Sequence, residues 1–434
     1  MSIWNTCHPC GYREPFTGES DPECPFCSQH MVMADDFGNE SHSVKTTKEI
    51  LKSNLDFPRS VISGAAGTYA GVYADTLESP VQFFYISYLT CLGSAISGKV
   101  WMGSELYTQP RMYTLLLGES ADDRKSTAIK KTTSLFDGMI DVCHGVGSAE
   151  GLQRVLDDKP SVVLCLDEFK AFVGKATIQS SVLLPCVNTL FEDNKYSNVT
   201  QKSHITIENA HLSLLAASTV DTYERTWSAE FTDIGFNNRL FIVPGGAERK
   251  HFFPPKIDNF VKQQIQSELG AIIARCKDGI ELTITDDARD IMQDWYKLGE
   301  RSMYTKRIEG YATRLMMLLA INDGVTEITE HIARKTIELV NWQVIVRKRF
   351  DPIEADSAMA KMEANIRRIL SNSDGEGMLE GALKKRCHYE RAGIWVFNSA
   401  LKNLETACEI VSREVPIDAK IPRTVTRWFK TDDE

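Results

Sequence analysis

The sequence predicts a mixed α/β protein with a three-layer core and a small module at each end. Two cysteine pairs stand within the first 27 residues. Apolar runs that end in a glycine or in carboxylates then alternate with stretches of helical periodicity, as in a parallel sheet covered by helices. Further helical stretches and a hairpin-like pattern close the chain. We therefore expect a ribbon at 1–30, a linker at 31–56, an α/β core with a helical beginning at 57–250, a helical lid-like domain at 251–352 and a terminal domain at 357–434.

The first module is defined by its cysteines. Cys7-x2-Cys10 is followed, thirteen residues later, by Cys24-x2-Cys27. This spacing is typical of a zinc ribbon, in which two tight turns close a tetrahedron of four thiolates. A catalytic metal is disfavoured because four thiolates leave no open position, and so short a module needs the metal in order to fold. The alternative is a disulfide framework, which the expected reducing cytoplasm disfavours. The partner of the ribbon, nucleic acid or protein, stays open. Two neighbouring histidines are spare candidate ligands, His8 and His30.

The bulk composition is that of a globular protein. Of 434 residues, 43% are hydrophobic and 25% are charged. The net charge of −10 excludes a generally basic nucleic-acid coat but permits local basic surfaces. No leader is visible, and the most apolar stretch, 81–98, is too short and polar to span a bilayer. Ser79 as N-cap and Pro80 at the first helical position predict a buried helix there. We expect a cytoplasmic protein without a membrane contact.

The core contains a candidate phosphate loop. The apolar run 112–117 predicts a buried strand, Gly118 follows it, and a helix is expected from Lys125 onward. Backbone N–H groups and the helix dipole attract phosphates at such a junction. Lys125 would reach the β and γ oxygens, and the Ser126 hydroxyl would bind Mg²⁺. The loop is unusual because six residues separate Gly118 from Lys125 and Arg124 stands where a second glycine is expected.

Other predicted contacts to the nucleotide come from the same loop and from the start of the helix. They are Gly118, Ser120, Arg124 and Thr127. The Arg124 side chain either brings positive charge to the γ-phosphate or points away from it. Taken alone, the loop also fits an ordinary basic helix start.

A second element makes the nucleotide interpretation stronger. The run 161–166 is a predicted buried strand, and Asp167 and Glu168 follow it directly. Ligands of open α/β sheets bind at the carboxyl ends of the strands. Asp167 would hold Mg²⁺ through water, and Glu168 would orient and polarise the attacking water. Together with the Lys-Ser-Thr triplet about forty residues earlier, this pattern predicts a site for ATP and Mg²⁺.

Two further strands contribute candidate residues. The run that begins at His211 turns polar at Ser218 and Thr219, and either hydroxyl is a candidate sensor of the γ-phosphate; a simple cap on the next turn is the alternative. Arg239 follows a glycine-containing turn and precedes an apolar strand. An arginine there can project from the subunit edge and stabilise charge on a neighbour's nucleotide. The alternative is a surface arginine in an ion pair.

Taken in order, these runs resemble a known family. FPRSVISGAAGTYAGVYADTLESPVQFFYISYLTCLGSAISG, MYTLLLGESADDRKSTA, VVLCLDEF, HLSLLAAST and GFNNRLF are similar to segments of the helicase-like ATPases of phages, prophages and integrative elements. Members often carry Arg-Lys-Ser-Thr in the phosphate loop. The resemblance covers residues 57–350. It implies an ASCE-type P-loop ATPase of the AAA+/helicase kind that works on DNA during replication of a mobile element.

The region after the core resembles the minichromosome-maintenance type of replicative helicase. The segments ELTITDDARDIMQDWYKLGER and RIEGYATRLMMLLAINDGVTEITEHIARKTIELV correspond to a lid-like helical bundle in that comparison. In that comparison Arg314 matches the arginine that contacts the nucleotide from the lid, and Arg307 is the alternative. The competing interpretation is that Arg314 is an ordinary arginine on the helix surface. Periodicity independently predicts a helix with a wide apolar face: Leu315, Met316, Leu318, Leu319 and Ile321.

The C-terminal segment predicts a winged helix. An amphipathic helix, two further helices and a hairpin-like EIVSREVPIDAKIPRTVTRWF follow that plan. Basic residues are candidates for phosphate contacts, although acidic residues are about as numerous. They are Lys384, Lys385, Arg386 and Arg391 near the second helix, and Lys420, Arg423, Arg427 and Lys430 in the wing. The alternatives are a solvated charged face or a docking surface for partners.

The features together predict an ATP-driven DNA helicase or translocase. We expect a homo-oligomeric ring, a hexamer, that acts on single-stranded or forked DNA beside other replication proteins. The alternative is an ATP-dependent switch or loader that binds DNA or a replication protein without unwinding. A third hypothesis is a transcription regulator with a zinc ribbon, a winged helix and an inactive ATPase core. The altered loop at Arg124 is the only observation that supports it. Lys125, Asp167 and Glu168 are all retained, which speaks against decay.

Overall fold

The computed structural model describes residues 55–431 together with three short N-terminal strands. The described range omits 119–122, 179–180, 200–203, 227–234, 247–251, 300, 351–357, 372, 374–376 and 419–420. The N-terminal strands are β1 (Trp4–Thr6), β2 (Arg13–Pro15) and β3 (Val32–Ala34). Contacts divide the chain into two compact units. One comprises 57–368 with 387–404, and the other comprises 1–56 with 369–386 and 405–434.

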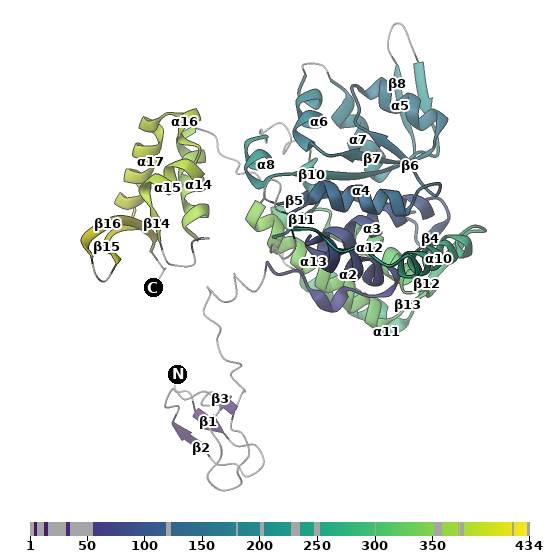
Figure 1. Cartoon of the computed structure of the whole chain (residues 1–434), viewed down its shortest axis with the longest axis horizontal. Coiled ribbons are helices and arrows are strands. Elements are labelled where there is room, and N and C mark those ends of the chain that lie inside the picture. The colour runs from purple at the N-terminus through teal and green to yellow at the C-terminus, as the bar shows by residue number, and fades with distance from the viewer. Residues whose placement is uncertain are drawn as a thin grey trace. The chain divides into compact units, whose positions relative to one another are not determined.

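A five-stranded parallel sheet forms the centre of the larger unit. Its order is β11-β5-β10-β7-β6 (Figure 1). The strands are β5 (Tyr113–Leu117), β6 (Asp141–His144), β7 (Ser161–Leu166), β10 (His211–Ser218) and β11 (Phe241–Pro244). Strands β5 and β10 are buried throughout because helices cover both faces, and such strands read as continuous apolar runs. The α/β class is therefore confirmed, and strands lie within the apolar runs 112–117 and 161–166 and in the run that begins at His211.

Helices lie on both faces of this sheet. On one face α3 (Val81–Ile96) packs against β5, β7 and β10, and α4 (Lys125–Leu135) packs beside α3. On the other face α6 (Phe169–Ala176) and α7 (Leu183–Glu192) contact β10, and α5 (Ala149–Asp158) lies on the same side (Figure 1). Every residue of α3 from 83 to 96 is buried, as predicted for a helix inside the core.

The start of α3 differs slightly from its prediction. Pro80 is the N-cap rather than the first helical residue, and it makes no side-chain capping bond. The Ser79 hydroxyl instead donates to the Asp123 carbonyl at 3.1 Å. Helix α2 (Gly64–Leu77) precedes this junction and packs along α3.

The region from 251 to 352 belongs to the same compact unit as the core. Its helices are α10 (Asn259–Arg275), α11 (Asp286–Leu298), α12 (Ile308–Asn322) and α13 (Glu330–Phe350). A second parallel sheet, β13-β12-β4, joins β12 (Ile280–Ile284) and β13 (Glu327–Ile328) to β4 (Val100–Met102), which follows α3. The Tyr311 hydroxyl donates to the Arg239 carbonyl at 2.6 Å, and Asn322 accepts from the Ala66 amide at 2.7 Å. These contacts join the region to the core, and its role as a lid-like domain stays a prediction.

A hairpin that the sequence did not predict lies between α7 and β10. Its strands are β8 (Tyr196–Val199) and β9 (His204–Ile207), paired antiparallel. It contacts α5 and α7 on the upper side of the sheet in Figure 1. Helix α8 (Val220–Thr226) then follows β10.

The two ends of the chain each contribute a small antiparallel sheet. At the N-terminus the order is β2-β1-β3, so the sheet includes 32–34 from the predicted linker. The C-terminal elements are α14 (Ala358–Ser371), β14 (Met378–Leu379), α15 (Glu380–Arg386), α16 (Tyr389–Ala392), α17 (Ile394–Thr406), β15 (Ile410–Asp418) and β16 (Ile421–Lys430). Strands β15 and β16 form the predicted hairpin, and β14 adds a third strand. The winged-helix assignment stays a prediction.

None of the described helices combines the length and the apolarity needed to cross a bilayer.

Candidate functional site

Strand register brings the three predicted motifs to one edge of the sheet. Leu117 of β5 is level with Ser218 of β10, and Leu166 of β7 is level with Ala216 of β10. Gly118 and Asp167 each come directly after these strands. They therefore lie at the carboxyl edge on either side of the end of β10. Two strand spacings, roughly 10 Å, separate them, and side chains can bridge that distance.

The loop after β5 is closed by contacts to its two ends. The Gly118 amide donates to the Ser218 carbonyl at 3.3 Å, and Lys125 Nζ donates to the Gly118 carbonyl at 2.9 Å. A Cβ at position 118 would lie 2.4 Å from Asp123 Oδ2, so a larger residue there would require the Asp123 side chain to move. The predicted helix begins at Lys125 as expected. Ser120 lies outside the described residues.

Arg124 takes the backbone conformation that a glycine would favour. Its φ of 50° and ψ of 37° are left-handed, and it is the N-cap of α4. The Arg124 guanidinium lies 2.8 Å from a carboxylate oxygen of Glu78, whose side chain is 2% exposed. Glu78 is also left-handed, with φ 51°. The Arg124 guanidinium thus points toward Glu78 at the end of α2.

The first turn of α4 presents polar groups beside this loop. Ser126 is exposed and Thr127 is half-buried. The first turn of α4 contains no acidic residue, but the Asp123 carboxylate lies beside Gly118 just before the helix. The positive end of the helix dipole favours an anion at this place. A backbone glycine, a lysine and an exposed hydroxyl are the kinds of group that bind the terminal phosphates and Mg²⁺ of a nucleotide.

Asp167 and Glu168 are both exposed at the same edge. Glu168 is the N-cap of α6, yet its carboxylate makes no capping bond. The preceding Cys165 is a poor nucleophile, because burial raises the pKa of its thiol to about 12 and Asp167 adds to the effect. The two carboxylates are the acid–base groups that β7 presents at this edge.

The two candidate sensors differ in their surroundings. The Thr219 hydroxyl donates to Thr222 Oγ1 at 2.8 Å and accepts from the Thr222 amide at 3.1 Å, so it caps α8. Ser218 is the last residue of β10, and its hydroxyl donates to the Thr219 carbonyl at 3.0 Å. Since Ser218 also holds Gly118 through its carbonyl, its position fits the sensor better. The sensor role itself stays a prediction.

Arg239 lies at the opposite, amino edge of the sheet. It ends the short helix η2 (Asn237–Arg239) before β11, whose Phe241 is level with Thr114 of β5. Its Nη1 donates to the Gly235 carbonyl at 2.8 Å, and its Nε lies 3.9 Å from Glu192 Oε1. The side chain is only 9% exposed, so it faces its own chain and does not project from an edge. Burial, with Arg307 adding to it, lowers the pKa of this guanidinium.

Arg314 is also held at the amino edge. Its Nη1 donates to the carbonyls of Gln109 and Arg111, and its Nη2 donates to the Phe191 carbonyl at 2.7 Å. The guanidinium also lies 4.1 Å from the centre of the Phe191 ring. Because 109 and 111 precede β5 while Gly118 follows it, roughly 20 Å of strand separates the two places. In a single chain Arg314 therefore does not contact a nucleotide at Gly118.

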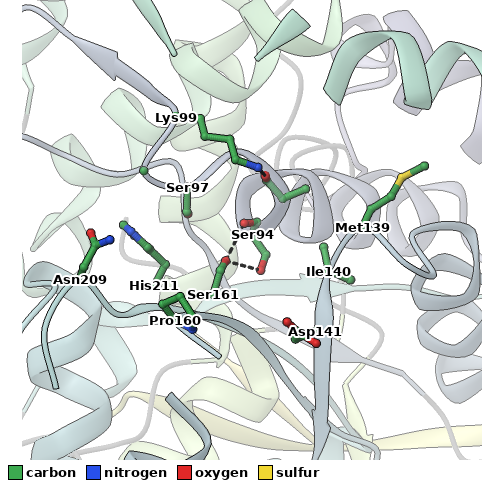
Figure 2. Close-up of a pocket in the computed structure, with 12 residues that line it drawn as sticks. Ser94, Ser97, Lys99, Met139, Ile140, Asp141, Pro160, Ser161, Asn209 and His211 are labelled. Atoms are coloured by element: carbon green, nitrogen blue, oxygen red, sulfur yellow. Dashed lines mark hydrogen bonds between the residues drawn. The ribbon is translucent and has the colours of Figure 1, made fainter. Parts of the chain in front are cut away.

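A cavity that the sequence did not predict opens at this amino edge (Figure 2). Its volume is about 360 Å³. The end of α3 and the first residues of β6, β7 and β10 line it, including Ser94, Asp141, Ser161 and His211. The Ser161 hydroxyl donates to the Ser94 carbonyl at 2.8 Å. Burial lowers the pKa of His211 to about 4, with Arg111 adding to the effect, so the ring is neutral at pH 7.

The predicted zinc ligands lie outside the described residues: Cys7, Cys10, Cys24 and Cys27. Within the part of the chain that is described, no group of three or more His, Cys, Asp or Glu side chains is arranged to hold a metal. Comparison with models of protein families and with curated proteins found no match for this chain.

Proposed function

We propose that this protein is a P-loop ATPase of the AAA+/helicase kind, with its nucleotide at the carboxyl edge of the central sheet. One observation carries the proposal. The register of β5, β10 and β7 gathers the Gly118 loop, Ser218 and the Asp167–Glu168 pair at one edge. Ligands of open α/β sheets bind at that edge.

Each residue of this edge has a chemical task. Lys125 would neutralise charge on the β- and γ-phosphates, while Ser126 and Asp167 would hold the magnesium ion that accompanies ATP. Bound Mg²⁺ would supply additional charge stabilisation. Glu168 takes a proton from the attacking water, for which an exposed carboxylate without a capping bond is suited.

The strand order supports the ASCE class. One strand, β10, stands between the strand that carries the loop and the strand that ends in the carboxylates. An additional strand and a catalytic glutamate are the features for which this class is named. The same order sets Lys125 and Glu168 apart by the width of β10, which leaves room for a γ-phosphate and a water between them.

The amino-edge position of Arg239 supports hydrolysis between subunits. Arg239 comes two residues before Phe241, and Gly118 comes four residues after the level of Phe241, so roughly 20 Å separates them. Arg239 is thus too far from the nucleotide of its own chain to act on it. A ring in which the amino edge of one subunit meets the carboxyl edge of the next would bring Arg239 to a nucleotide.

DNA as the substrate of the motor rests on the sequence resemblance and on the two end modules. The N-terminal register supports a zinc ribbon, because Thr6 pairs with Val32 while Cys7 follows Thr6 and Cys27 stands five residues before Val32. We infer a DNA helicase or translocase that serves replication of a phage or mobile element.

A switch or loader is the second candidate. Arg239 lies close to Glu192 of its own chain and is not at the proposed nucleotide site of that chain. ATP turnover would therefore depend on assembly with a second chain, and an ATPase whose activity depends on assembly can serve as a switch. Strand displacement separates the two candidates, because a loader hydrolyses ATP without unwinding DNA.

Steady-state ATP hydrolysis with and without single-stranded DNA tests the proposal. Glu168→Gln should reduce turnover by at least about a hundredfold, the usual contribution of a general base. Glu208→Gln, which removes an exposed carboxylate paired with Lys195, should leave turnover unchanged. Equal turnover in the Glu168→Gln variant and the wild type would refute the site. DNA-stimulated turnover would support a motor, and turnover indifferent to DNA would favour the loader.

A further inference from the structure

Three arginines meet at one carboxylate on the amino edge. Glu192 ends α7, and its carboxylate pairs with Arg307 and lies 3.9 Å from Arg239 and 3.7 Å from Arg314. These arginines come from η2, from the start of α12 and from its interior. A single negative charge is thus shared by guanidinium groups from segments far apart in the sequence.

The cluster is layered from the surface inward. The Glu192 and Arg307 side chains are 46% and 39% exposed, whereas Arg239 and Arg314 are 9% and 3% exposed. The carboxylate therefore lies at the outside of the cluster, and the two inner guanidinium groups lie behind it. An anion that arrived from solvent would meet Glu192 and Arg307 first.

The inner arginine has partners that do not depend on Glu192. Arg314 donates to three backbone carbonyls, those of Gln109, Arg111 and Phe191. The neighbouring carboxylate of Asp193 accepts from the backbone amides of Asn194 and Lys195. The cluster thus retains its framework when the Glu192 carboxylate moves away, and Asp193 is not positioned to replace it.

We propose that Glu192 occupies, within the chain, a phosphate-binding site formed by Arg239 and Arg307 with Arg314 behind them. On assembly, the terminal phosphates of the nucleotide on the neighbouring subunit displace the carboxylate. Guanidinium groups bind carboxylate and phosphate with the same paired geometry, so one anion can substitute for the other. Glu192 then acts as a positioning residue that keeps Arg239 engaged until a phosphate competes for it.

This inference rests on the proposed function for the source of the phosphate, but its test does not require hydrolysis. All proteins carry Lys125→Ala, which removes the proposed nucleotide site. Binding of inorganic pyrophosphate is then measured by the shift in thermal unfolding. Three variants are compared with this Lys125→Ala protein. The first adds Glu192→Gln, and the second adds both Glu192→Gln and Arg307→Ala. The third adds Glu208→Gln as a control, because it also removes an exposed carboxylate that is paired with a cation.

Glu192→Gln should tighten pyrophosphate binding by about threefold to tenfold, the range for removing a competing charge near the surface. Adding Arg307→Ala should abolish that gain, and Glu208→Gln should produce none. Equal affinity in all four proteins would overturn the proposal. Should Glu192→Gln fail to fold, Arg307→Gln alone must weaken pyrophosphate binding, and unchanged binding there would equally overturn it.

Two further results separate the source of the phosphate from the site. With Lys125 intact, Glu192→Gln should lower the protein concentration at which turnover is half-maximal, and an unchanged concentration would overturn the role in assembly. A single-stranded oligonucleotide that displaces pyrophosphate from the Glu192→Gln protein would assign the site to a nucleic-acid backbone instead. Absence of ATP turnover in the wild type would count against the proposed function. The pyrophosphate experiment would still test the phosphate-binding site at Glu192, because it does not require hydrolysis.

Discussion

At the scale of single residues, Arg124 explains how the loop keeps its shape without a second glycine. A left-handed conformation costs a non-glycine residue about 1 kcal/mol or more. Here the residue is held by the 2.8 Å contact with the buried Glu78 carboxylate, and Ser79 binds the adjacent Asp123 carbonyl. The glycine that is absent from the sequence is thus replaced by a strained residue that a salt bridge fixes.

Arg124→Gly provides a test of this balance. Relief of the left-handed backbone should stabilise the fold by about 1 kcal/mol, whereas loss of the cation beside a buried carboxylate should cost about 2 kcal/mol. We expect a net loss near 1 kcal/mol in the free energy of unfolding. Adding Glu78→Gln should restore most of it, because the carboxylate charge is then gone. A more stable Arg124→Gly protein in urea titration would show that the salt bridge contributes little.

His211 should make stability depend on pH. An unfolded histidine binds its proton with a pKa of about 6.5, whereas burial lowers the pKa of His211 to about 4. Between these values the unfolded chain binds more protons, so the free energy of unfolding falls as pH drops from about 6.5 to 4. The loss amounts to about 3 kcal/mol. Urea titration at pH 7.5 and 4.5 should give His211→Gln a smaller decrease than the wild type, and equal decreases would contradict the assignment.

At the scale of elements, α3 supports the whole candidate site. It packs under β5, β7 and β10, and the junction before it holds Asp123 and Arg124 through Ser79 and Glu78. Its close approach to the chain before β5 requires a glycine. A Cβ at Gly93 would lie 2.1 Å from the Pro110 carbonyl oxygen, and a backbone carbonyl cannot move aside cheaply.

Two glycine-to-alanine changes separate packing from helix propensity. Both Gly93 in α3 and Gly270 in α10 lie inside helices, where alanine is favoured by about 1 kcal/mol. A Cβ at Gly270 would meet open space, so Gly270→Ala should stabilise the protein by about 0.5–1 kcal/mol. Gly93→Ala should instead destabilise it by about 3 kcal/mol through overpacking. Thermal unfolding of both variants checks this, and a stable Gly93→Ala protein would contradict the close approach.

Elements with a strong local pattern were predictable from the sequence. The strand ending at Leu117, the helix starting at Lys125 and the hairpin of β15 and β16 follow from apolar runs and turn residues. Their register was not predictable, because residues that lie level in neighbouring strands, such as Leu117 and Ser218, are about a hundred residues apart in the sequence. The places of Arg239 and Arg314 were missed for the same reason, since the carbonyls and carboxylate that hold them come from distant segments.

At the scale of the whole molecule, the candidate residues of the larger unit lie at two opposite edges of the central sheet. The carboxyl edge carries Lys125, Asp167 and Glu168, and the amino edge carries Arg239 with the Glu192 cluster. Roughly 20 Å of strand lies between them. A single chain presents the two halves of the proposed site too far apart to join them, and in the proposed assembly a neighbouring copy would supply the missing half.

Mixing two inactive variants tests this division. Lys125→Ala removes the lysine that faces the phosphates but keeps Arg239, whereas Arg239→Ala keeps the carboxyl edge and removes the arginine that would act in trans. Each variant alone should have little turnover, because phosphoryl charge stabilised by such an arginine contributes about a thousandfold or more. Mixed assemblies contain interfaces at which Lys125 of one chain meets Arg239 of another. Turnover in the mixture should therefore exceed the sum of the separate activities.

Random mixing sets the size of that gain. In an equimolar mixture, about a quarter of the interfaces would combine both intact residues, so up to about a quarter of wild-type turnover should return if interfaces act independently. A control mixture of Arg239→Ala with the Lys125→Ala/Arg239→Ala double variant contains no complete interface and should stay inactive. Turnover of Arg239→Ala alone at the wild-type level would show that Arg239 serves only the packing of η2. Recovery in the first mixture and not in the second would place the reaction at the junction of two chains.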